Sequence, residues 1–458
     1  MTPTQRSVLV ALAITCACTS DLGAGETTSD LGAGETSAGT DGGPAPELPD
    51  PVALGGCTMS PGELYGDAVR HAVIECPRAS GVRVAASDAG VMMTSNSADS
   101  AWLFHTGPDG FEIEVLPDEF VNSETLLSQD DAGNVAFVVS KFEEEGWDGS
   151  RGSPQYLVRD GDSWSIEPTI SDSVRLESFE LDAAGNPTIW FSDRTNYALH
   201  RLTRGGSDQW LAEPIADADA DDRYNLAIDD DELHYYYAPA GAYHYQLAVN
   251  DNGSLSPVSS FTQYLEHYQP VPPPRPSSPE SGPRALVVQQ AKDGLSLRGS
   301  EGFVVEIPGT SLAAPSCPYS PADCEQSCHD LGGGMRPEAF GVTRATDGSV
   351  WIGWVTVSND HWKVYAEACD EPDDDSSCAC VINGIMDDND SHNFHLARVI
   401  GEDVEEILTL EISGTNGPYA LRGIDLRAYG DRLAVGLRSN PSHALDAVFH
   451  LLDIDIGD

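Results

Sequence analysis

Lysine is almost absent from this chain of 458 residues, in which it occurs three times, as Lys141, Lys292 and Lys363. Lysine and arginine together number 24, against 74 aspartates and glutamates, and the formal net charge at pH 7 is −50. Long-range repulsion of this size argues against nucleic acid, anionic lipid surfaces and acidic polysaccharides as direct partners. The negative charge is compatible with binding of divalent cations. A strongly acidic surface is also typical of an exported protein that stays soluble.

Long apolar runs are also missing, apart from Val8–Ile14 near the beginning of the chain. This run follows Arg6 and ends before a group of small residues and cysteines. It is too short to span a bilayer and has the layout of an export signal over residues 1–18. We expect no transmembrane segment after it, and membrane contact only through an anchor at the end of the signal.

The end of this signal resembles the lipobox of bacterial exported lipoproteins, in which a small residue precedes a cysteine that becomes lipidated. Ala17 matches the small position and Cys18 the acceptor, while Cys16 is a competing acceptor. The resemblance implies a lipid anchor at Cys18. Because Thr19 rather than aspartate follows, it also implies sorting to the outer membrane or the cell surface. Plain secretion is the alternative.

Residues 19–56 form a low-complexity stretch that begins with a perfect duplication of nine residues, 19–27 and 28–36. Glycine, alanine, proline and aspartate dominate the remainder. A segment of this composition cannot bury an apolar core, so we predict a disordered tether between the anchor and the folded domain.

In residues 57–458, short runs of β-branched and aromatic residues flank tight turns rich in aspartate, glycine and asparagine. Glycine and asparagine tolerate the positive φ of a two-residue hairpin turn, so each unit predicts a β-hairpin. A second hairpin follows each of the first. All-strand units that recur every 43 to 82 residues predict an all-β fold, a single β-propeller of about seven four-stranded blades, with six or eight as alternatives. The turn residues of the seven units are Gly90, Gly133, Gly185, Asp231, Gly294, Gly348 and Gly430.

Two of these turns share a motif in which aspartate precedes Gly-Asn and an apolar strand. The motif spans Asp131–Asn134 and, with one extra residue, Asp182–Asn186. It resembles the repeats of NHL and gluconolactonase-like propellers, and Asp347–Gly353 is similar to the propeller repeats of two-component sensor proteins. The likeness rests on turn chemistry, so it supports the fold and carries little information on function.

Beyond Cys18 the chain has eight cysteines, an even number that predicts four disulfides in an oxidising compartment. Cys57 and Cys76 form the expected local pair. The other six fall in two segments, and their connectivity stays open. A zinc site built from some of them with His329 is the alternative. The six are Cys317, Cys324, Cys328, Cys369, Cys378 and Cys380.

Connections of an antiparallel blade alternate between its two ends. The short Asp/Gly turns are therefore expected at one rim of the propeller, and every long excursion at the other. Loops held on a rigid scaffold concentrate binding residues, so the second rim is the predicted binding face. Its candidate contact residues are Trp147, Arg336 and His392. The excursions placed there are residues 141–155, the proline run 269–276, and the segments 317–334 and 369–393.

Two acidic runs on the last excursion are weak candidates for a calcium site, because carboxylate oxygens are the ligands that calcium prefers. They lack the glycine-turned spacing of a calcium loop, and no cofactor is certain. The candidate ligands are Asp373, Asp375, Asp387 and Asp390.

No catalytic residue can be assigned, since no nucleophile motif or catalytic carboxylate pair is recognisable. The preferred hypothesis is a surface-tethered, monomeric, non-enzymatic propeller that binds a protein or carbohydrate ligand. The alternative is an extracellular propeller hydrolase or lactonase, for which calcium is a candidate cofactor.

Overall fold

The computed structural model divides the chain into two units, residues 1–47 and 48–458, and only residues of the second unit are described. The predicted export signal, the lipid acceptor Cys18 and most of the predicted tether lie outside them. The described residues are 48–457, apart from 67, 108, 142–152, 161–162, 171–173, 193–198, 206–208, 215–224, 230–231, 238–243, 252–253, 263–266, 273, 277–285, 292–293, 300–302, 309, 311–325, 331–333, 359–361, 370–377, 387–390, 413–420 and 440–445.

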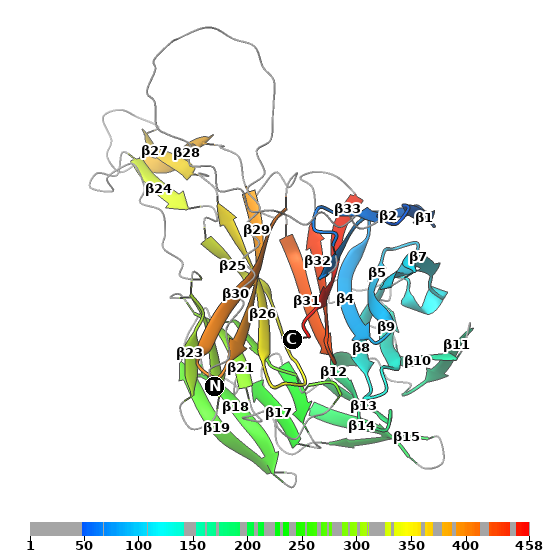
Figure 1. The fold of residues 1–458 in the computed structure, drawn as a ribbon. Coiled ribbons are helices and arrows are strands. Elements are labelled where there is room, and N and C mark those ends of the chain that lie inside the picture. Colours follow the sequence, from blue (N-terminus) through cyan, green and yellow to red (C-terminus); the bar gives the residue numbers. More distant parts are fainter. Residues whose placement is uncertain are drawn as a thin grey trace, which may run out of the picture. The chain divides into compact units, whose positions relative to one another are not determined.

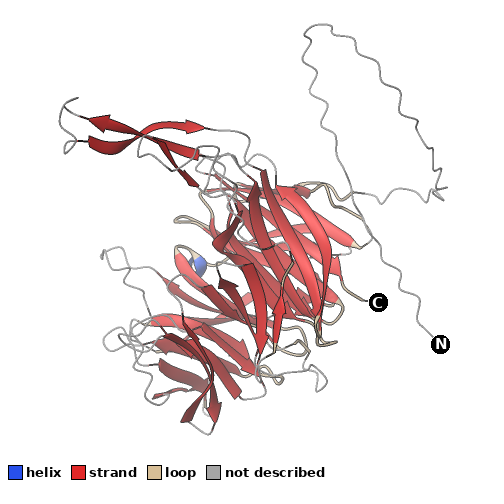
Figure 2. Cartoon of the chain, turned by 90° about the vertical axis from the view of Figure 1, so that its left-hand side faces the viewer, coloured by secondary structure: helices blue, strands red, loops and turns tan. Residues whose placement is uncertain are grey.

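Strands make up almost all of the regular structure in the described residues, and the one helical element there is a 3-10 turn, η1 (Asp118–Phe120) (Figure 2). In the first half of the chain, consecutive strands pair antiparallel in groups of four. These sheets are β4 (Ser80–Ser87), β5 (Gly90–Asn96), β6 (Ala101–Gly107) and β7 (Gly110–Val115); β8 (Ser123–Gln129), β9 (Val135–Lys141), β10 (Gln155–Asp160) and β11 (Ser163–Pro168); and β12 (Arg175–Leu181), β13 (Pro187–Ser192), β14 (Leu199–Arg204) and β15 (Trp210–Pro214).

The same antiparallel order continues through the second half of the chain. Two of its sheets are consecutive, and a third is interrupted by an excursion. They are β16 (Asn225–Asp229), β17 (Glu232–Tyr237), β18 (His244–Asp251) and β19 (Ser254–Thr262); β20 (His267–Pro270), β21 (Leu286–Ala291), β22 (Gly294–Gly299) and β23 (Val304–Glu306); and β25 (Gly334–Arg344), β26 (Val350–Ser358), β29 (Ser391–Ile400) and β30 (Asp403–Ile412).

The last sheet joins the two ends of the described chain. Its strand β3 (Val69–Pro77) lies beside β33 (Asp446–Asp455), so an early segment completes the sheet of β31 (Leu421–Tyr429) and β32 (Arg432–Ser439). A hairpin of β1 (Val52–Leu54) and β2 (Cys57–Pro61) extends this sheet beyond β3. The excursion that interrupts the preceding sheet contributes a separate three-stranded sheet of β24 (Gln326–Asp330), β27 (Trp362–Cys369) and β28 (Cys378–Met386).

The first strands of the seven larger sheets contact one another in an unbroken cycle, β4, β8, β12, β16, β20, β25, β31 and again β4. We call them the inner strands. Figure 1 labels five of them, β25, β31, β4, β8 and β12. A cycle of four-stranded antiparallel sheets with the first strand innermost is a β-propeller, and the predicted all-β propeller is therefore confirmed.

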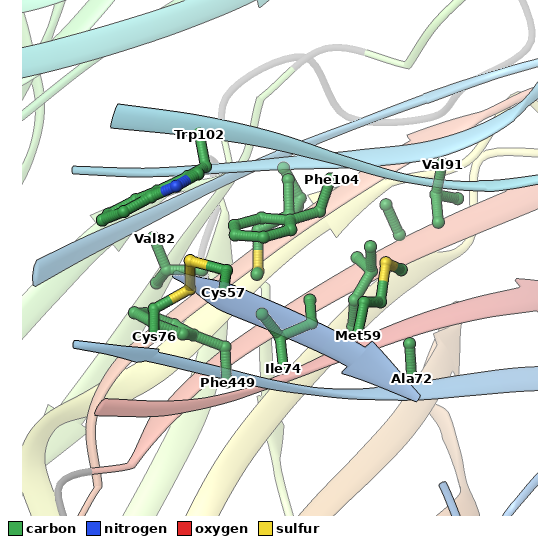
Figure 3. Packing of buried hydrophobic residues seen from close by; sticks show 14 of the residues in the cluster. Cys57, Met59, Ala72, Ile74, Cys76, Val82, Val91, Trp102, Phe104 and Phe449 are labelled. Atoms are coloured by element: carbon green, nitrogen blue, oxygen red, sulfur yellow. A yellow bond between two sulfur atoms is a disulfide. The ribbon is translucent and has the colours of Figure 1, made fainter. Parts of the chain in front are cut away.

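The apolar core lies between neighbouring sheets rather than in one central mass. Each of the five buried clusters of described residues draws its members from two adjacent sheets. The cluster in Figure 3 joins the last sheet to the first, where Phe449 and Ile74 pack with Trp102 and Phe104. Burial of alternating side chains on both faces of each sheet explains why the strands read as nearly continuous apolar runs.

The predicted disulfide between Cys57 and Cys76 is present, and it ties β2 to β3 inside this cluster (Figure 3). The hairpin that contains Cys57 also contacts β7 of the first sheet, and Trp102 Nε1 on β6 donates a hydrogen bond of 3.2 Å to the carbonyl oxygen of Gly55. The beginning of the described chain thus closes the ring both as a strand and through covalent and side-chain contacts.

The Asp-Gly-Asn motif is a three-residue hairpin loop, not the two-residue turn expected from the sequence. Asp130 Oδ1 accepts hydrogen bonds from the backbone N–H groups of Ala132 and Asn134, at 2.9 and 2.8 Å, and Gly133 has φ +81°. Asp182 makes the same bonds in its own turn. The equivalent of Asp182 is therefore Asp130 rather than Asp131, and the two motifs have equal length. A loop of this type needs glycine at its left-handed position.

A side-chain contact that the sequence patterns did not predict recurs between the outer strands of adjacent sheets. Glu114 on β7 accepts a hydrogen bond of 3.0 Å from Trp164 Nε1 on β11 and pairs with Arg159 on β10 at 2.9 Å. One sheet further on, Glu167 on β11 does the same with Trp210 Nε1 and Arg204, both at 2.9 Å. Each carboxylate therefore joins its own sheet to the next one at the periphery.

Candidate functional site

The alternating connections define two rims of the propeller, and the connections found at each rim agree with the prediction in part. The turn rim holds the connections from first to second strand, among them the turns at Gly133, Gly185 and Gly348. The loop rim holds the connections from second to third strand and from sheet to sheet. Residues 142–154, the stretch from 307 to 333 and the stretch from 359 to 390 all connect at the loop rim, as predicted.

The proline run was placed wrongly. It connects the first strand of its sheet, β20, to the second, β21, and therefore lies at the turn rim. The turn that ends at Gly294 was predicted at the turn rim. It lies at the loop rim, since it connects the second strand β21 to the third strand β22. Both errors have one cause: the first strand, β20, is short and polar and carries no signal of its own in the sequence.

Arg275, at the end of the proline run, reaches across the ring at the turn rim. Its guanidinium donates to the carbonyl oxygen of Leu181 at 2.7 Å and pairs with Asp131 Oδ1 at 3.2 Å. Its own carbonyl oxygen accepts a hydrogen bond of 2.8 Å from the N–H of Gly430. Tyr429 completes the link, since its hydroxyl donates to the carbonyl oxygen of Asp131 at 2.9 Å. One loop thereby joins four of the seven sheets across the turn end of the channel.

A buried carboxylate lies beneath this link. Burial raises the pKa of Glu180, and the guanidinium groups of Arg275 and Arg427 together with a hydrogen bond of 3.2 Å from Ser128 oppose that rise. Arg275 Nη2 lies 3.8 Å from Glu180 Oε2. Arg275 therefore has a second role here, as the counter-charge of a largely buried carboxylate whose side chain is 20% exposed.

At the loop rim, four inner strands are irregular close to their first residues. The register of the pairing with the second strand shifts at this end of each. In three of the strands the shift has the form of a β-bulge, whereas in β25 four residues stand opposite one of β26. The irregular positions therefore lie around one mouth of the propeller. They lie between Ser80 and Arg83, Leu176 and Ser178, Met335 and Phe340, and Leu421 and Gly423.

The first of these bulges opens into a groove of about 240 Å³ between the sheets of β4 and β8. Arg83 lines it, held by hydrogen bonds from Nη1 to the carbonyl oxygen of Val82 at 3.0 Å and from Nε to that of Thr125 at 3.2 Å. Asn96 fixes the opposite wall, because its amide donates to the carbonyl oxygens of Phe120 and Ser123 at 3.1 and 2.8 Å. The groove is therefore a preformed site with one cationic group.

A second cavity, of about 180 Å³, lies at the turn rim of the last sheet. Asp453 is buried in its wall and pairs with Arg432 at 2.8 Å and with Arg70 at 3.6 Å. Burial raises the pKa of Asp453, and both guanidinium groups oppose the rise. Because these charges satisfy one another within the wall, this cavity is better explained as an ion-paired joint between strands than as a ligand site.

Two of the three predicted contact residues lie on strands at the loop rim: Arg336 falls within the irregular part of β25, and His392 is the second residue of the third strand β29. Trp147 lies outside the described residues, as do the predicted calcium ligands Asp373, Asp375, Asp387 and Asp390. Among the described residues, no group of three or more histidine, cysteine, aspartate or glutamate side chains has the arrangement of a metal site.

Of the six cysteines with open connectivity, four lie on described strands. Cys317 and Cys324 lie outside the described residues, while Cys328 is on β24, Cys369 ends β27, and Cys378 and Cys380 begin β28. No helix of the described residues is long and apolar enough to cross a membrane.

Arg83 and Arg275 were both missed from the sequence. Arg275 stands within the proline run, which was expected to be a stiff connection at the other rim. The one available signal for Arg83 was its place after Gly81 in an otherwise apolar strand, since a glycine inside a strand marks a bulge.

Comparison with protein-family models and with curated proteins finds no match. Among solved structures, TolB from Acinetobacter baumannii is 12% identical with a TM-score of 0.32, covering 51% of this chain and 61% of TolB. A streptogramin B lyase is 13% identical (TM-score 0.32; 62% of this chain, 94% of that one), and the polysaccharide lyase Uly1 is 9% identical (TM-score 0.32; 92% and 94%). Likeness at this level concerns the fold alone.

Proposed function

We propose that this chain is an exported binding propeller that takes its ligand at the loop rim. The observation that supports this most directly is the position of Arg275, which links four sheets across the turn end of the channel. A ligand would then approach the channel from the other end. That end carries the preformed groove beside Arg83 and the long excursions.

We prefer the form of this proposal in which the protein binds its ligand without catalysing a reaction. The polar groups described around the groove fix one another or the backbone, as Asn96 does, and do not form a nucleophile with an adjacent base. An extracellular hydrolase or lactonase is the alternative, with catalytic groups supplied by the loop-rim excursions.

The location forms part of the same proposal. A lipid on Cys18 and a tether of about forty residues would hold the propeller near a membrane while leaving the loop rim accessible. The partner is a protein or a carbohydrate, the propeller acts as a monomer, and calcium stays a candidate cofactor of the acidic excursion.

The rim assignment is tested with two bulky substitutions on the full mature chain. Ser80→Trp fills the mouth of the loop-rim groove from an exposed position, and Asp431→Trp places the same ring at the turn rim. Both proteins and the wild type are incubated with arrays of peptides and glycans. Saturable binding that Ser80→Trp abolishes and Asp431→Trp preserves supports the proposal.

The reverse pattern, with binding lost only in Asp431→Trp, would refute the choice of rim. Mass spectrometry of the bound ligand separates the two forms of the proposal, because a binding protein returns the ligand unchanged. Cleaved or ring-opened product in the wild-type reaction would establish the hydrolase alternative instead.

A further inference from the structure

We infer that the groove beside Arg83 recognises a sugar acid: a uronic-acid residue whose carboxylate meets the Arg83 guanidinium and whose hydroxyl groups bond to the groove wall. This inference rests on the proposed binding function and names the chemistry of its ligand. Three observations support it, namely the fixed guanidinium, its charge environment and the hydrogen-bond state of nearby serines.

The guanidinium is oriented before any ligand arrives. Two backbone carbonyl oxygens, of Val82 and Thr125, accept from its Nη1 and Nε atoms at 3.0 and 3.2 Å. Arg83 lines the groove and is partly exposed. A fixed planar fork of donors matches a carboxylate, and little side-chain entropy is lost when the pair forms.

Arg83 has no carboxylate partner among the described residues. Nine other described arginines lie within 4.0 Å of an aspartate or glutamate, whereas Arg83, like Arg298, makes no ion pair with any described residue. Glu124 also lines the groove but lies beyond ion-pair distance of Arg83. In a chain of net charge −50, an arginine without a carboxylate in reach leaves that place for an anionic group of a ligand.

The serines beside the groove are arranged as acceptors. Ser80 Oγ donates to the carbonyl oxygen of Asn96 at 3.3 Å, and Ser95 Oγ donates to that of Ser80 at 3.2 Å. In this arrangement the hydroxyl protons point to acceptors within the protein, and the oxygen lone pairs are available to a donor on a ligand. A ligand that offers several hydroxyl donors beside a carboxylate, as a uronic acid does, fits this pattern better than a peptide C-terminus, which has a single backbone N–H donor next to its carboxylate.

The size and the overall charge restrict the ligand further. A groove of about 240 Å³ accommodates one sugar residue, and Val82, Leu116 and Phe120 give it apolar wall for the C–H face of a ring. The acidic surface would repel a dense polyanion. A single carboxylate that contacts Arg83 is attracted at short range, while salt screens it from acidic groups farther away than the Debye length of about 8 Å. The expected ligand is therefore one uronic-acid residue on an otherwise neutral glycan.

The test is a titration of the full mature chain with D-glucuronic acid, followed by NMR. D-glucose is the probe without a carboxylate, and N-acetyl-leucine is the probe with a carboxylate but no hydroxyl groups. Arg83→Gln removes the guanidinium, Arg83→Lys keeps the charge without the fork, and Arg298→Gln makes the same charge change outside the groove. Near-ultraviolet circular dichroism confirms that each variant is folded.

We expect glucuronic acid to bind at least about tenfold more tightly than glucose. Arg83→Gln should weaken it about tenfold or more, Arg83→Lys less, and Arg298→Gln not at all. Equal binding of glucuronic acid and glucose, or binding unchanged in Arg83→Gln, would overturn the inference. Binding of N-acetyl-leucine alone would overturn it in favour of a peptide carboxylate.

Failure of this inference is distinguishable from failure of the proposed function. If Ser80→Trp blocks an array ligand while Arg83→Gln leaves its binding unchanged, the loop rim still binds and only the sugar-acid chemistry is wrong. If neither variant affects binding, the rim assignment itself is wrong.

Discussion

His71 Nε2 lies 3.0 Å from His450 Nδ1, and this hydrogen bond joins the closing strand β3 to the last strand of the chain. The N–H of Leu64 donates to His71 Nδ1 at 3.4 Å, so the Nε2 atom of His71 carries the proton that His450 accepts. Both side chains are buried, and a Cβ at Gly62 would lie 2.3 Å from the His71 ring. The joint that closes the ring therefore depends on two neutral imidazoles.

Closure should weaken in mild acid. Burial lowers the pKa of His71 to about 4, and burial together with the nearby His71 lowers that of His450 to about 3. Their unfolded pKa is near 6.5. The unfolded chain thus binds more protons below that value, and stability present at pH 7 is lost as the pH falls, by up to about 1.4 kcal/mol per histidine per pH unit.

Urea unfolding at pH 7.5, 6 and 5 measures this effect. In the control variant with His71→Leu and His450→Leu, the fall in stability between pH 7.5 and 5 should largely disappear. An identical pH dependence in the wild type and this variant would mean that the pair is not the acid-sensitive element. The window stops at pH 5 because most carboxylates titrate below it.

Replacing Arg275 should loosen the turn rim. In Arg275→Gln the bonds to Leu181 and Asp131 are weakened and Glu180 loses a counter-charge, so we expect a loss of about 2 to 4 kcal/mol in unfolding free energy. Denaturant unfolding measures it. Adding Glu180→Gln should recover part of the loss, because the buried charge is then removed. If the two substitutions were simply additive, Glu180 and Arg275 would not be coupled.

Two substitutions of Trp164 separate the energy of its hydrogen bond from the energy of its ring packing. Trp164→Phe removes the donor to Glu114 and keeps a ring against Phe120 and Phe137, so we expect a cost of about 1 kcal/mol. Trp164→Ala also removes the ring, and about 3 kcal/mol is expected from its partly buried position. Thermal unfolding distinguishes the two, and equal losses would show that the hydrogen bond rather than the packing matters.

The register of the excursion makes one unassigned disulfide predictable. Cys369 and Cys378 are direct partners at the end of the pairing between β27 and β28. Directly opposite residues in an antiparallel pair have the backbone spacing that a disulfide spans. We expect non-reducing digestion and mass spectrometry to recover a peptide linked through Cys369 and Cys378. Linkage of either residue to Cys317, Cys324, Cys328 or Cys380 would contradict this pairing.

Local features were predictable because a few neighbouring residues decide them. The turns at Asp130 and Asp182 are specified by an aspartate that caps the loop and a glycine that adopts positive φ, and the Cys57–Cys76 pair by proximity. The motif was nevertheless aligned one residue late at Asp131, since two adjacent aspartates look alike until the hydrogen bonds distinguish them. Arg275 gave no pattern, and Arg83 gave only its place after Gly81, because the roles of both depend on partners from other sheets.

The sequence by itself determined that this protein is built of repeated hairpins with acidic, glycine-containing turns and apolar strands, since turn chemistry and strand patterning act within about ten residues. Only the tertiary structure decided that β3 completes the last sheet through His71 and His450, that the proline run crosses the turn rim, and that Arg83 faces a groove. These features depend on which distant segments become neighbours when the ring closes, and packing of the whole domain selects those neighbours.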